Sequence, residues 1–232
     1  MKIDCIADLH GYEPELPGGD LLILAGDYTA ADQLLQWSKF FTWLKAQNYE
    51  KKILIAGNHD NFFKTGFPTN QKEANDLKEV QAFLEEQKEM DKPDFEYLCD
   101  SGTEYLGLKI WGTPWTPWFK GVNPKCKAFM DSEGDLAKRF KLIPKGLDIL
   151  ISHGPPYAIL DKVELGGGIC KRVGSLSLAK KIDEVKPKIV ICGHIHEGYG
   201  FDLDPNTMIK YINCSYVNGD YQPVNKYIRV TL

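Results

Sequence analysis

The residues best suited to chemistry in this sequence are its histidines, and all of them follow short apolar runs. The chain has five histidines in 232 residues. Runs rich in Ile, Leu or Val end in polar clusters at residues 2–10, 20–27, 51–60, 147–156 and 188–196. Chance placement explains this pattern poorly. The clusters contain the candidate functional residues Asp8, His10, Asp27, Asn58, His59, Asp60, His153, His194 and His196.

Imidazole and carboxylate groups gathered in one place suit a transition metal. Residues i and i+2 of a strand point to the same side, so we expect Asp8 to converge with His10, and His194 with His196. Imidazole plus carboxylate, without thiolate, suits Mn²⁺, Fe, Zn²⁺ or Ni²⁺ in five- or six-coordinate geometry better than a structural tetrahedral zinc site. One such histidine alone is equally well explained as an ordinary polar group, but the joint pattern favours a metal site.

The elements that must position these residues alternate between strand and helix. Apolar runs of this length are typical of strands covered on both faces. Residues 31–48 carry an apolar helical stripe, residues 71–90 predict a charged and largely exposed helix, and residues 176–185 predict another helix. The alternation predicts an α/β fold with mostly parallel, layered sheets and a ligand site beyond the carboxyl ends of the strands.

Two regions break this alternation. Residues 103–112, and residues 208–215 with 226–232, indicate antiparallel strands, which a second sheet would accommodate. The sequence contains no repeat of solenoid length, no low-complexity tract and no segment with the composition of a linker. We therefore expect residues 1–232 to form a single domain.

Charge and composition argue against several classes of protein. The net charge of −4 and the lack of a long basic block disfavour a protein dedicated to duplex DNA. No stretch approaches about 18 apolar residues and the first residues lack a secretory signal, so we expect a cytoplasmic protein that does not bind membranes. The six cysteines form no CxxC pair and are expected to pack as small hydrophobic residues. The oligomeric state is not indicated by the sequence.

Five short motifs follow one another along the chain. They are D-x-H at residues 8–10, G-D at 26–27, G-N-H-D at 57–60, H-G at 153–154 and G-H-x-H at 193–196. Together they resemble the ordered signature of the calcineurin-like metallophosphoesterases over most of the chain. The segments GTPWTPWF, SHGPPYAILD and GHIHEGYG are similar in finer detail to the MPPED-like metallophosphodiesterases, whose members act on cyclic nucleotides and related phosphodiesters.

The resemblance implies an α/β/β/α fold with a dinuclear metal centre. It implies that one divalent cation is held by Asp8, His10 and His196, the other by Asn58, His153 and His194, and that Asp27 bridges both. Mn²⁺ is the first expectation, with Fe, Zn²⁺ or Ni²⁺ as alternatives. Two cations about 3.5–4 Å apart lower the pKa of a shared water and give a metal-bridging hydroxide that attacks phosphorus.

The resemblance also implies which residues are catalytic. His59 would stabilise the phosphoryl oxygens and protonate the leaving alkoxide without binding metal, and Asp60 would orient the His59 ring. A carboxylate in the sequence NHDN could instead cap the turn that follows. Tyr28 and Thr29 follow Asp27, and no acidic residue stands where many family members place one.

Several residues around the expected site have two interpretations. Trp115 and Phe119 could form an aromatic wall for a nucleobase, whereas Trp111 is expected in the core. The basic residues of segment 162–172 could meet substrate phosphates, although a solvated loop explains them better. The glycines of residues 165–174 permit a flap beside the site but do not form a P-loop.

The function that these observations favour is a two-metal phosphodiesterase acting on a small phosphodiester or nucleotide, for example a 2′,3′-cyclic nucleotide. A nuclease acting on DNA or RNA, a phosphomonoesterase and a non-catalytic metal-binding scaffold are the alternatives. A scaffold predicts damaged ligand positions, yet all seven are intact. A nuclease predicts a basic channel or an added capture domain, and this acidic chain shows neither.

Overall fold

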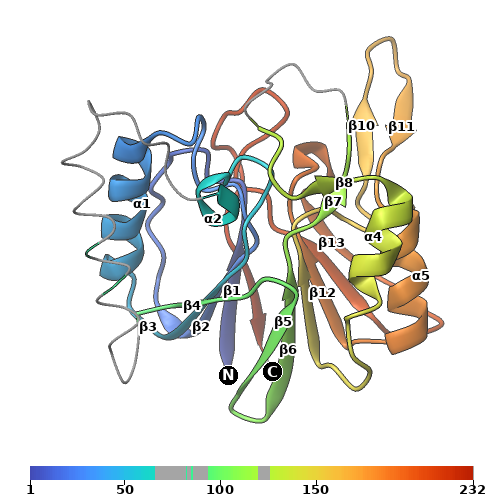
Figure 1. The fold of residues 1–232 in the computed structure, drawn as a ribbon, viewed down its shortest axis with the longest axis horizontal. Helices are drawn as coiled ribbons and strands as arrows, with labels where there is room; N and C mark the ends of the chain where they lie inside the picture. Colours follow the sequence, from blue (N-terminus) through green and yellow to red (C-terminus); the bar gives the residue numbers. More distant parts are fainter. Residues whose placement is uncertain (66–81, 83–84, 86–93, 120–125, 232) are drawn as a thin grey trace.

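Two β-sheets pack face to face and form the centre of the structure (Figure 1). The computed structural model describes residues 1–65, 82, 85, 94–119 and 126–231. The first sheet has the strand order β15-β1-β2-β3-β4, with bounds Ile228–Thr231, Lys2–Ile6, Gly19–Leu24, Tyr49–Leu54 and Glu96–Tyr97. The second has the order β13-β14-β12-β9-β6-β5, with bounds Gly200–Leu203, Lys210–Asn213, Ile189–Cys192, Ile149–Ser152, Leu108–Thr113 and Ser101–Tyr105.

Helices cover the outer faces of both sheets (Figure 1). α1 (Leu34–Ala46) lies on the first sheet, and α4 (Glu133–Phe140) and α5 (Leu176–Val185) lie on the second. The layer order α/β/β/α confirms the expected fold class. None of the helices in the described part of the chain has the length and apolar character of a membrane-spanning segment. The short elements are α2 (Phe62–Thr65), β7 (Thr116–Pro117), β8 (Met130–Asp131), β10 (Lys162–Glu164), β11 (Cys170–Arg172) and the 3-10 helix η2 (His196–Gly198).

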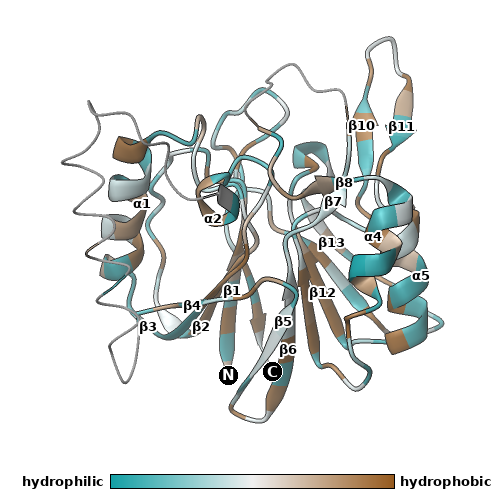
Figure 2. Ribbon diagram, viewed as in Figure 1, coloured by the Kyte–Doolittle hydropathy of each residue, from teal (hydrophilic) through white to brown (hydrophobic). Residues whose placement is uncertain are grey.

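Side-chain alternation explains why the apolar runs of the strands are continuous. In β2, Leu21 and Ile23 point into the space between the sheets, where Ile191 of β12 packs from the other side. Leu22 and Leu24 point the other way and pack with the buried face of α1. Figure 2 shows the hydrophobic residues concentrated along these central strands. A strand buried on both faces therefore needs apolar residues at every position.

The helices predicted at residues 31–48 and 176–185 are confirmed. α1 buries the whole predicted apolar stripe. α5 begins after Ser175, whose hydroxyl accepts a hydrogen bond from the backbone N–H of Leu178 and so satisfies one free donor of the first turn. The helix predicted at residues 71–90 lies outside the described part of the chain, apart from two isolated positions.

Antiparallel pairing occurs toward the edges of both sheets. β5 and β6 form the antiparallel hairpin expected for residues 103–112, and β15 pairs antiparallel with β1. The expectation for residues 208–215 is wrong in part, because β14 pairs parallel with β12 and antiparallel with β13. β14 lies inside its sheet, so its backbone groups form ladders on both sides and do not pair with β15.

The two sheets join at the carboxyl end of β1. The Ala7 backbone N–H donates to the Cys214 carbonyl at 2.9 Å, and the Ala7 carbonyl accepts from Tyr216 at 2.8 Å. This bridge is parallel, and so are the pairings of β1, β2 and β3 and of β9, β12 and β14. The carboxyl ends of these strands therefore lie at one edge, where the five polar clusters meet.

Trp115 belongs to the core and not to a wall for substrate. Its side chain is 7% exposed, and its Nε1 donates to Asp100 Oδ2 at 2.7 Å. The guanidinium carbon of Arg139, on α4, lies 3.2 Å from the centre of the ring. The aromatic-wall interpretation of Trp115 is wrong because α4 covers the indole. Trp111 packs against the same core, as expected.

Trp115 and Trp118 provide a matched test of this packing. Trp115→Ala should lower the free energy of unfolding by about 3–5 kcal/mol, because it leaves a cavity and removes a partner of Asp100. Trp118, which is 60% exposed, should tolerate the same change within about 0.5 kcal/mol. Urea unfolding followed by circular dichroism measures both. Equal losses for the two variants would contradict the assignment of Trp115 to the core.

Candidate metal centre

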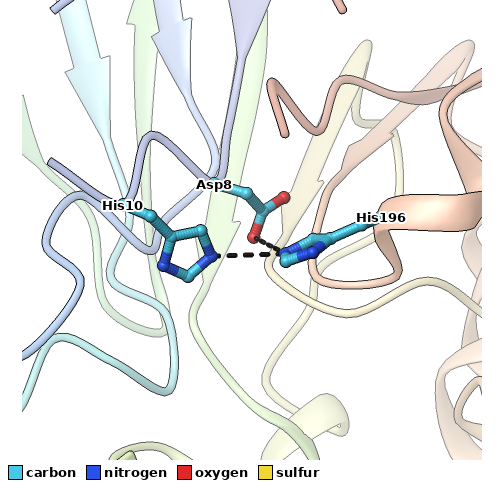
Figure 3. Close-up of side chains that lie close together, drawn as sticks. All are labelled: Asp8, His10 and His196. Carbon is cyan, nitrogen blue, oxygen red and sulfur yellow. Dashed lines mark hydrogen bonds and ion pairs between the residues drawn. The ribbon is translucent and has the colours of Figure 1, made fainter. Parts of the chain in front are cut away.

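Three side chains from the two sheets converge at the shared edge (Figure 3). Asp8 and His10 follow β1, and His196 opens η2 after β12. The Nε2 atoms of His10 and His196 are 3.2 Å apart, and His196 Nε2 lies 3.7 Å from Asp8 Oδ1. One potential ligand atom from each residue lies within 4.8 Å of the others, so the three could hold one cation.

A second group lies beside the first. It contains Asp27, His153 and His194, which follow β2, β9 and β12. His153 Nε2 lies 3.4 Å from Asp27 Oδ1 and 3.0 Å from Asn58 Oδ1. The rings of His153 and His194 are 4.9 Å apart between centroids. Asn58 thus adds an amide oxygen to a group that could hold another cation.

Asp27 stands between the two groups. Its Oδ1 faces His153, whereas its Oδ2 lies 4.0 Å from His10 Nε2. The residue is 2% exposed. A carboxylate whose two oxygens face different groups has the arrangement that a bridging ligand requires.

The donor atoms of this centre fit divalent cations. Asp8 Oδ1 is buried without a hydrogen-bond partner among the described residues, and a bound cation would remove the free-energy cost of that isolation. Carboxylate, imidazole and amide groups without thiolate suit Mn²⁺, Fe or Zn²⁺. Burial raises the pKa of the neighbouring Cys192 thiol, which favours the neutral form and agrees with the expected packing role.

Four of the seven candidate ligands have left-handed backbone conformations. The φ angles are 53° at Asp8, 44° at His10, 57° at Asp27 and 68° at His194. Such angles are uncommon for residues other than glycine and cluster at functional sites. They also correct the strand-alternation argument, because these residues lie beyond the strands. His194 and His196 consequently turn apart and join different groups.

The glycines of the G-N-H-D and G-H-x-H motifs are required by close approach. A Cβ atom at Gly57 would lie 2.2 Å from Asp27 Oδ1 and 2.6 Å from His153 Cε1. A Cβ atom at Gly193 would lie 2.4 Å from Asp8 Oδ2. Any larger residue at either position would push a candidate ligand out of place.

Burial and charge set the protonation of the candidate ligands. Burial lowers the pKa of His10 to about 4 and that of His194 to about 3, so both rings are neutral near pH 7, as metal ligands must be. Burial acts in the same direction on His153, but the charge of Asp27 outweighs it and raises the pKa of His153 to about 9. A cation bound beside Asp27 would take the place of that proton, because both stabilise the same negative charge.

Asp60 accepts hydrogen bonds from the backbone of two loops. Its carboxylate accepts from the N–H groups of Gly57 at 2.7 Å, Asp27 at 2.8 Å and Tyr28 at 3.1 Å. Burial, and then the charge of Asp27, raise the pKa of Asp60 well above its usual value. These hydrogen bonds tie the loop after β2 to the loop after β3, and the role of Asp60 in orienting the His59 ring stays a prediction.

His59 is held by two groups that carry no signal in the sequence. Its Nδ1 lies 3.2 Å from the Ala30 carbonyl and 3.0 Å from Cys126 Sγ, while its Nε2 lies 3.9 Å from Asp27 Oδ2. The Ala30 carbonyl thus supports the ring where an acidic side chain was missing. A backbone carbonyl carries no residue-specific signal, and Cys126 is 67 positions away in sequence.

The centre opens into two adjoining cavities of about 710 and 600 Å³. Both are lined by Asn58, His59, Phe119 and Tyr221. Phe119 is 43% exposed and its ring centroid lies 5.7 Å from that of His194, so its position agrees with the expected aromatic wall.

A hairpin formed by β10 and β11 borders the smaller cavity and projects from the molecule (Figure 1). Lys171 and Arg172 line the cavity, whereas Lys162 is exposed on the opposite strand. Arg172 Nη1 pairs with the buried Asp161 at 2.8 Å. Lys171 is therefore better placed than Arg172 to meet a substrate.

The comparisons with known proteins agree with this geometry. Residues 1–198 match the family model for calcineurin-like phosphoesterases. The chain is 36% identical to metallophosphoesterase domain-containing protein 1 of Homo sapiens, over 98% of this chain and 70% of that protein. It is 34% identical to a UPF0046 protein of Caenorhabditis elegans, over 94% of this chain and 56% of that protein. A solved Thermus thermophilus structure matches with a TM-score of 0.57 at 15% identity, over 91% and 88% of the two chains, which supports the fold alone.

The fold and the centre define a metal-dependent phosphoester hydrolase. The chain belongs to the calcineurin-like phosphoesterase family, as its motifs predicted, and this family depends on two metal ions. The similarity to metallophosphoesterase domain-containing protein 1 also confirms the resemblance to MPPED-like proteins that the three longer segments of the sequence indicated.

Metal content tests the central position of Asp27. Protein loaded with Mn²⁺ should bind about two metals per chain, and Asp27→Asn should lose most of both, because a neutral amide bridges two cations poorly. Elemental analysis after desalting measures this. Cys192→Ala is the control, and it should keep both metals while losing only stability, on the order of 1–2 kcal/mol. Metal loss in the Cys192 variant with retention in the Asp27 variant would contradict the placement of the centre.

Proposed function

We propose that this protein is a phosphodiesterase for small or single-stranded phosphodiesters, with 2′,3′-cyclic nucleotides as the first candidates. We further propose that it uses two divalent cations, with Mn²⁺ as the first choice. The ligands that we assign to one cation are Asp8, His10 and His196, those for the other are Asn58, His153 and His194, and Asp27 lies between them. When bound, two cations neutralise phosphate charge and activate a water molecule for in-line attack.

The lining of the 600 Å³ cavity carries the proposal. Apart from the candidate ligands, the cavity is lined by two basic residues, Lys171 and Arg172, and by two acidic residues, Glu133 and Glu197. Arg172 is paired with Asp161, so little net positive charge is left. Such a cavity suits a phosphodiester, which carries one negative charge, better than a dianionic monoester or a polyanionic nucleic acid.

Exposed aromatic rings in the same cavity support an organic substituent on the phosphate. The rings belong to Trp118, Phe119, Tyr157 and Tyr221, and each is at least 40% exposed. Aromatic rings that remain accessible beside polar groups are suited to contact the apolar part of a ligand. This feature supports a nucleotide or aryl ester in preference to inorganic or simple alkyl phosphates.

His59 supplies the proton that completes the reaction. When Nδ1–H donates to the Ala30 carbonyl, the ring is fixed with Nε2 directed toward Asp27. In its imidazolium form, His59 donates the Nε2 proton to the leaving alkoxide as the bond between phosphorus and that oxygen breaks. Asn58 is neutral and limits the negative charge that faces the substrate phosphate.

A substrate panel tests the proposed function. Cyclic 2′,3′ and 3′,5′ nucleotides, aryl phosphodiesters, aryl phosphomonoesters and short single strands should be assayed with Mn²⁺. We expect the small diesters to give the highest kcat/KM. Cleavage of monoesters with every diester left intact would refute the phosphodiesterase proposal, and a preference for long strands would favour a nuclease.

The role of His59 is tested by its leaving-group dependence. His59→Gln should lower kcat/KM for nucleotide diesters by about 10²–10⁴-fold, the usual contribution of a positioned general acid. The loss should be much smaller for nitrophenyl diesters, because nitrophenolate leaves readily without a proton. Kinetics with both substrates measure the difference.

Metal content separates this role from ligation. His59 also lies within ligand distance of His10 and Asp27. His59→Gln should nevertheless keep both metals, whereas the matched variant His10→Gln should lose one. Metal loss in the His59 variant would make His59 a ligand, and equal losses for both substrate types would leave it an electrostatic role only.

A further inference from the structure

A tight turn at residues 218–222 lies beyond the segment that matches the family model, which ends at residue 198. The Asn218 side chain closes the turn, because its Oδ1 accepts from the N–H of Asp220 at 3.1 Å and of Gln222 at 2.9 Å. The Tyr221 N–H donates to the Asn218 carbonyl at 2.9 Å. The turn is thus defined by its own hydrogen bonds.

The same turn is attached directly to the metal centre. The Asn218 carbonyl lies 3.1 Å from His196 Nδ1, so it can accept the ring proton and leave Nε2 free for a cation. On the other side, the Tyr12 hydroxyl donates to the Tyr221 carbonyl at 3.2 Å. The position of the turn relative to the candidate ligands is therefore fixed at both ends.

The turn directs the Tyr221 ring toward the centre. The ring centroid lies 4.8 Å from that of His10 and 5.0 Å from that of His196, with both pairs in edge arrangements. Tyr221 has a φ of 58°, an angle that costs free energy for a residue with a side chain. A strained backbone that holds an aromatic ring beside two candidate ligands calls for a functional explanation.

Packing against His10 and His196 explains only part of the Tyr221 ring, because the rest of the ring is exposed. Tyr221 is 46% exposed and lines both cavities, together with the accessible ring of Phe119. A residue needed only to pack His10 and His196 could be an aliphatic side chain without an open face. The exposed part of Tyr221 faces the space that substrate must enter.

We propose that Tyr221 is a specificity-determining residue whose ring stacks on the nucleobase of the substrate. This inference rests on the proposed function and narrows it to phosphodiesters that carry a base. A base has an aromatic face whatever its identity, so stacking on Tyr221 selects nucleotides over alkyl esters without choosing among bases. The phosphate is held at the metal centre and the base at the ring.

A pair of probes isolates the contribution of the base. AMP and ribose 5-phosphate share the ribose and the phosphate and differ by the adenine. Calorimetric titration of the Mn²⁺-loaded protein gives the affinity for each probe without requiring turnover. We expect the protein to bind AMP at least about 10-fold more tightly than ribose 5-phosphate, because stacking of a base on one aromatic ring contributes an affinity of this size.

Three variants test whether Tyr221 is the source of that preference. Tyr221→Leu should remove most of the AMP preference and leave the affinity for ribose 5-phosphate unchanged, because leucine keeps the apolar packing against His10 and His196. Tyr221→Phe keeps the ring and should keep the preference. Phe201→Leu is the control, since Phe201 is another exposed aromatic ring, 67% accessible, on β13 and outside both cavities.

The outcomes separate this inference from the proposed function. Equal binding of the two probes by the unaltered protein, or an undiminished preference in Tyr221→Leu, would overturn the stacking role. If Tyr221→Leu lost affinity for AMP and for ribose 5-phosphate equally, and lost metal as well, Tyr221 would only pack the candidate metal ligands. That result would also overturn the stacking role. If the preference depends on Tyr221 while no diester is hydrolysed, the inference stands and the phosphodiesterase proposal fails.

Discussion

Three carboxylates are buried close together in space at the edge where the two sheets join, and the other groups of the centre compensate for the free-energy cost of that burial. Asp8, Asp27 and Asp60 are each at most 2% exposed. An isolated buried charge is strongly unfavourable, so each carboxylate needs donors or a cation. Backbone N–H groups provide much of this compensation, because Asp60 accepts three of them and Asp8 Oδ2 accepts one from His194. The carboxylates thereby fix the loops that carry the candidate ligands.

This compensation explains why the centre combines strained loops with a rigid frame. Left-handed residues such as Asp8 and Asp27 allow their backbone groups to meet partners from neighbouring loops. The free-energy cost of such conformations is tolerated because the loops begin at strands buried on both faces. One oxygen of Asp8 is left without a donor among the described residues, and it points to the position that a cation would fill. Hydrogen bonds satisfy the polar groups of the loops, and bound cations would satisfy the remaining ligand atoms of the centre.

Three exposed features lie outside the five family motifs and surround the buried frame. The β10–β11 hairpin, Phe119 and the turn at residues 218–222 are exposed, and they border the cavities without being part of the buried core. Their side chains contribute rings and a limited positive charge, and in the function proposed above these groups select the substrate while the buried centre carries out the chemistry at phosphorus. The turn also reaches His196 through the Asn218 carbonyl, so a segment beyond the family match helps to orient a candidate ligand.

The sequence alone predicted the fold class, the five strands that carry the polar clusters, the helices α1 and α5, and the polar residues that meet at one edge, because apolar runs ending in Asp, His or Asn carry a strong local signal. It did not predict α4, the β10–β11 hairpin or β13. It left open whether Trp115 lies in the core or forms a wall, because a buried and an exposed indole can have the same local sequence. It also did not indicate that Asp60 binds backbone N–H groups of two loops. It also missed the support of His59 by Cys126 and the Ala30 carbonyl. Only the tertiary structure decided these contacts, because hydrogen bonds to backbone groups and packing across distant segments leave no pattern in the order of side chains.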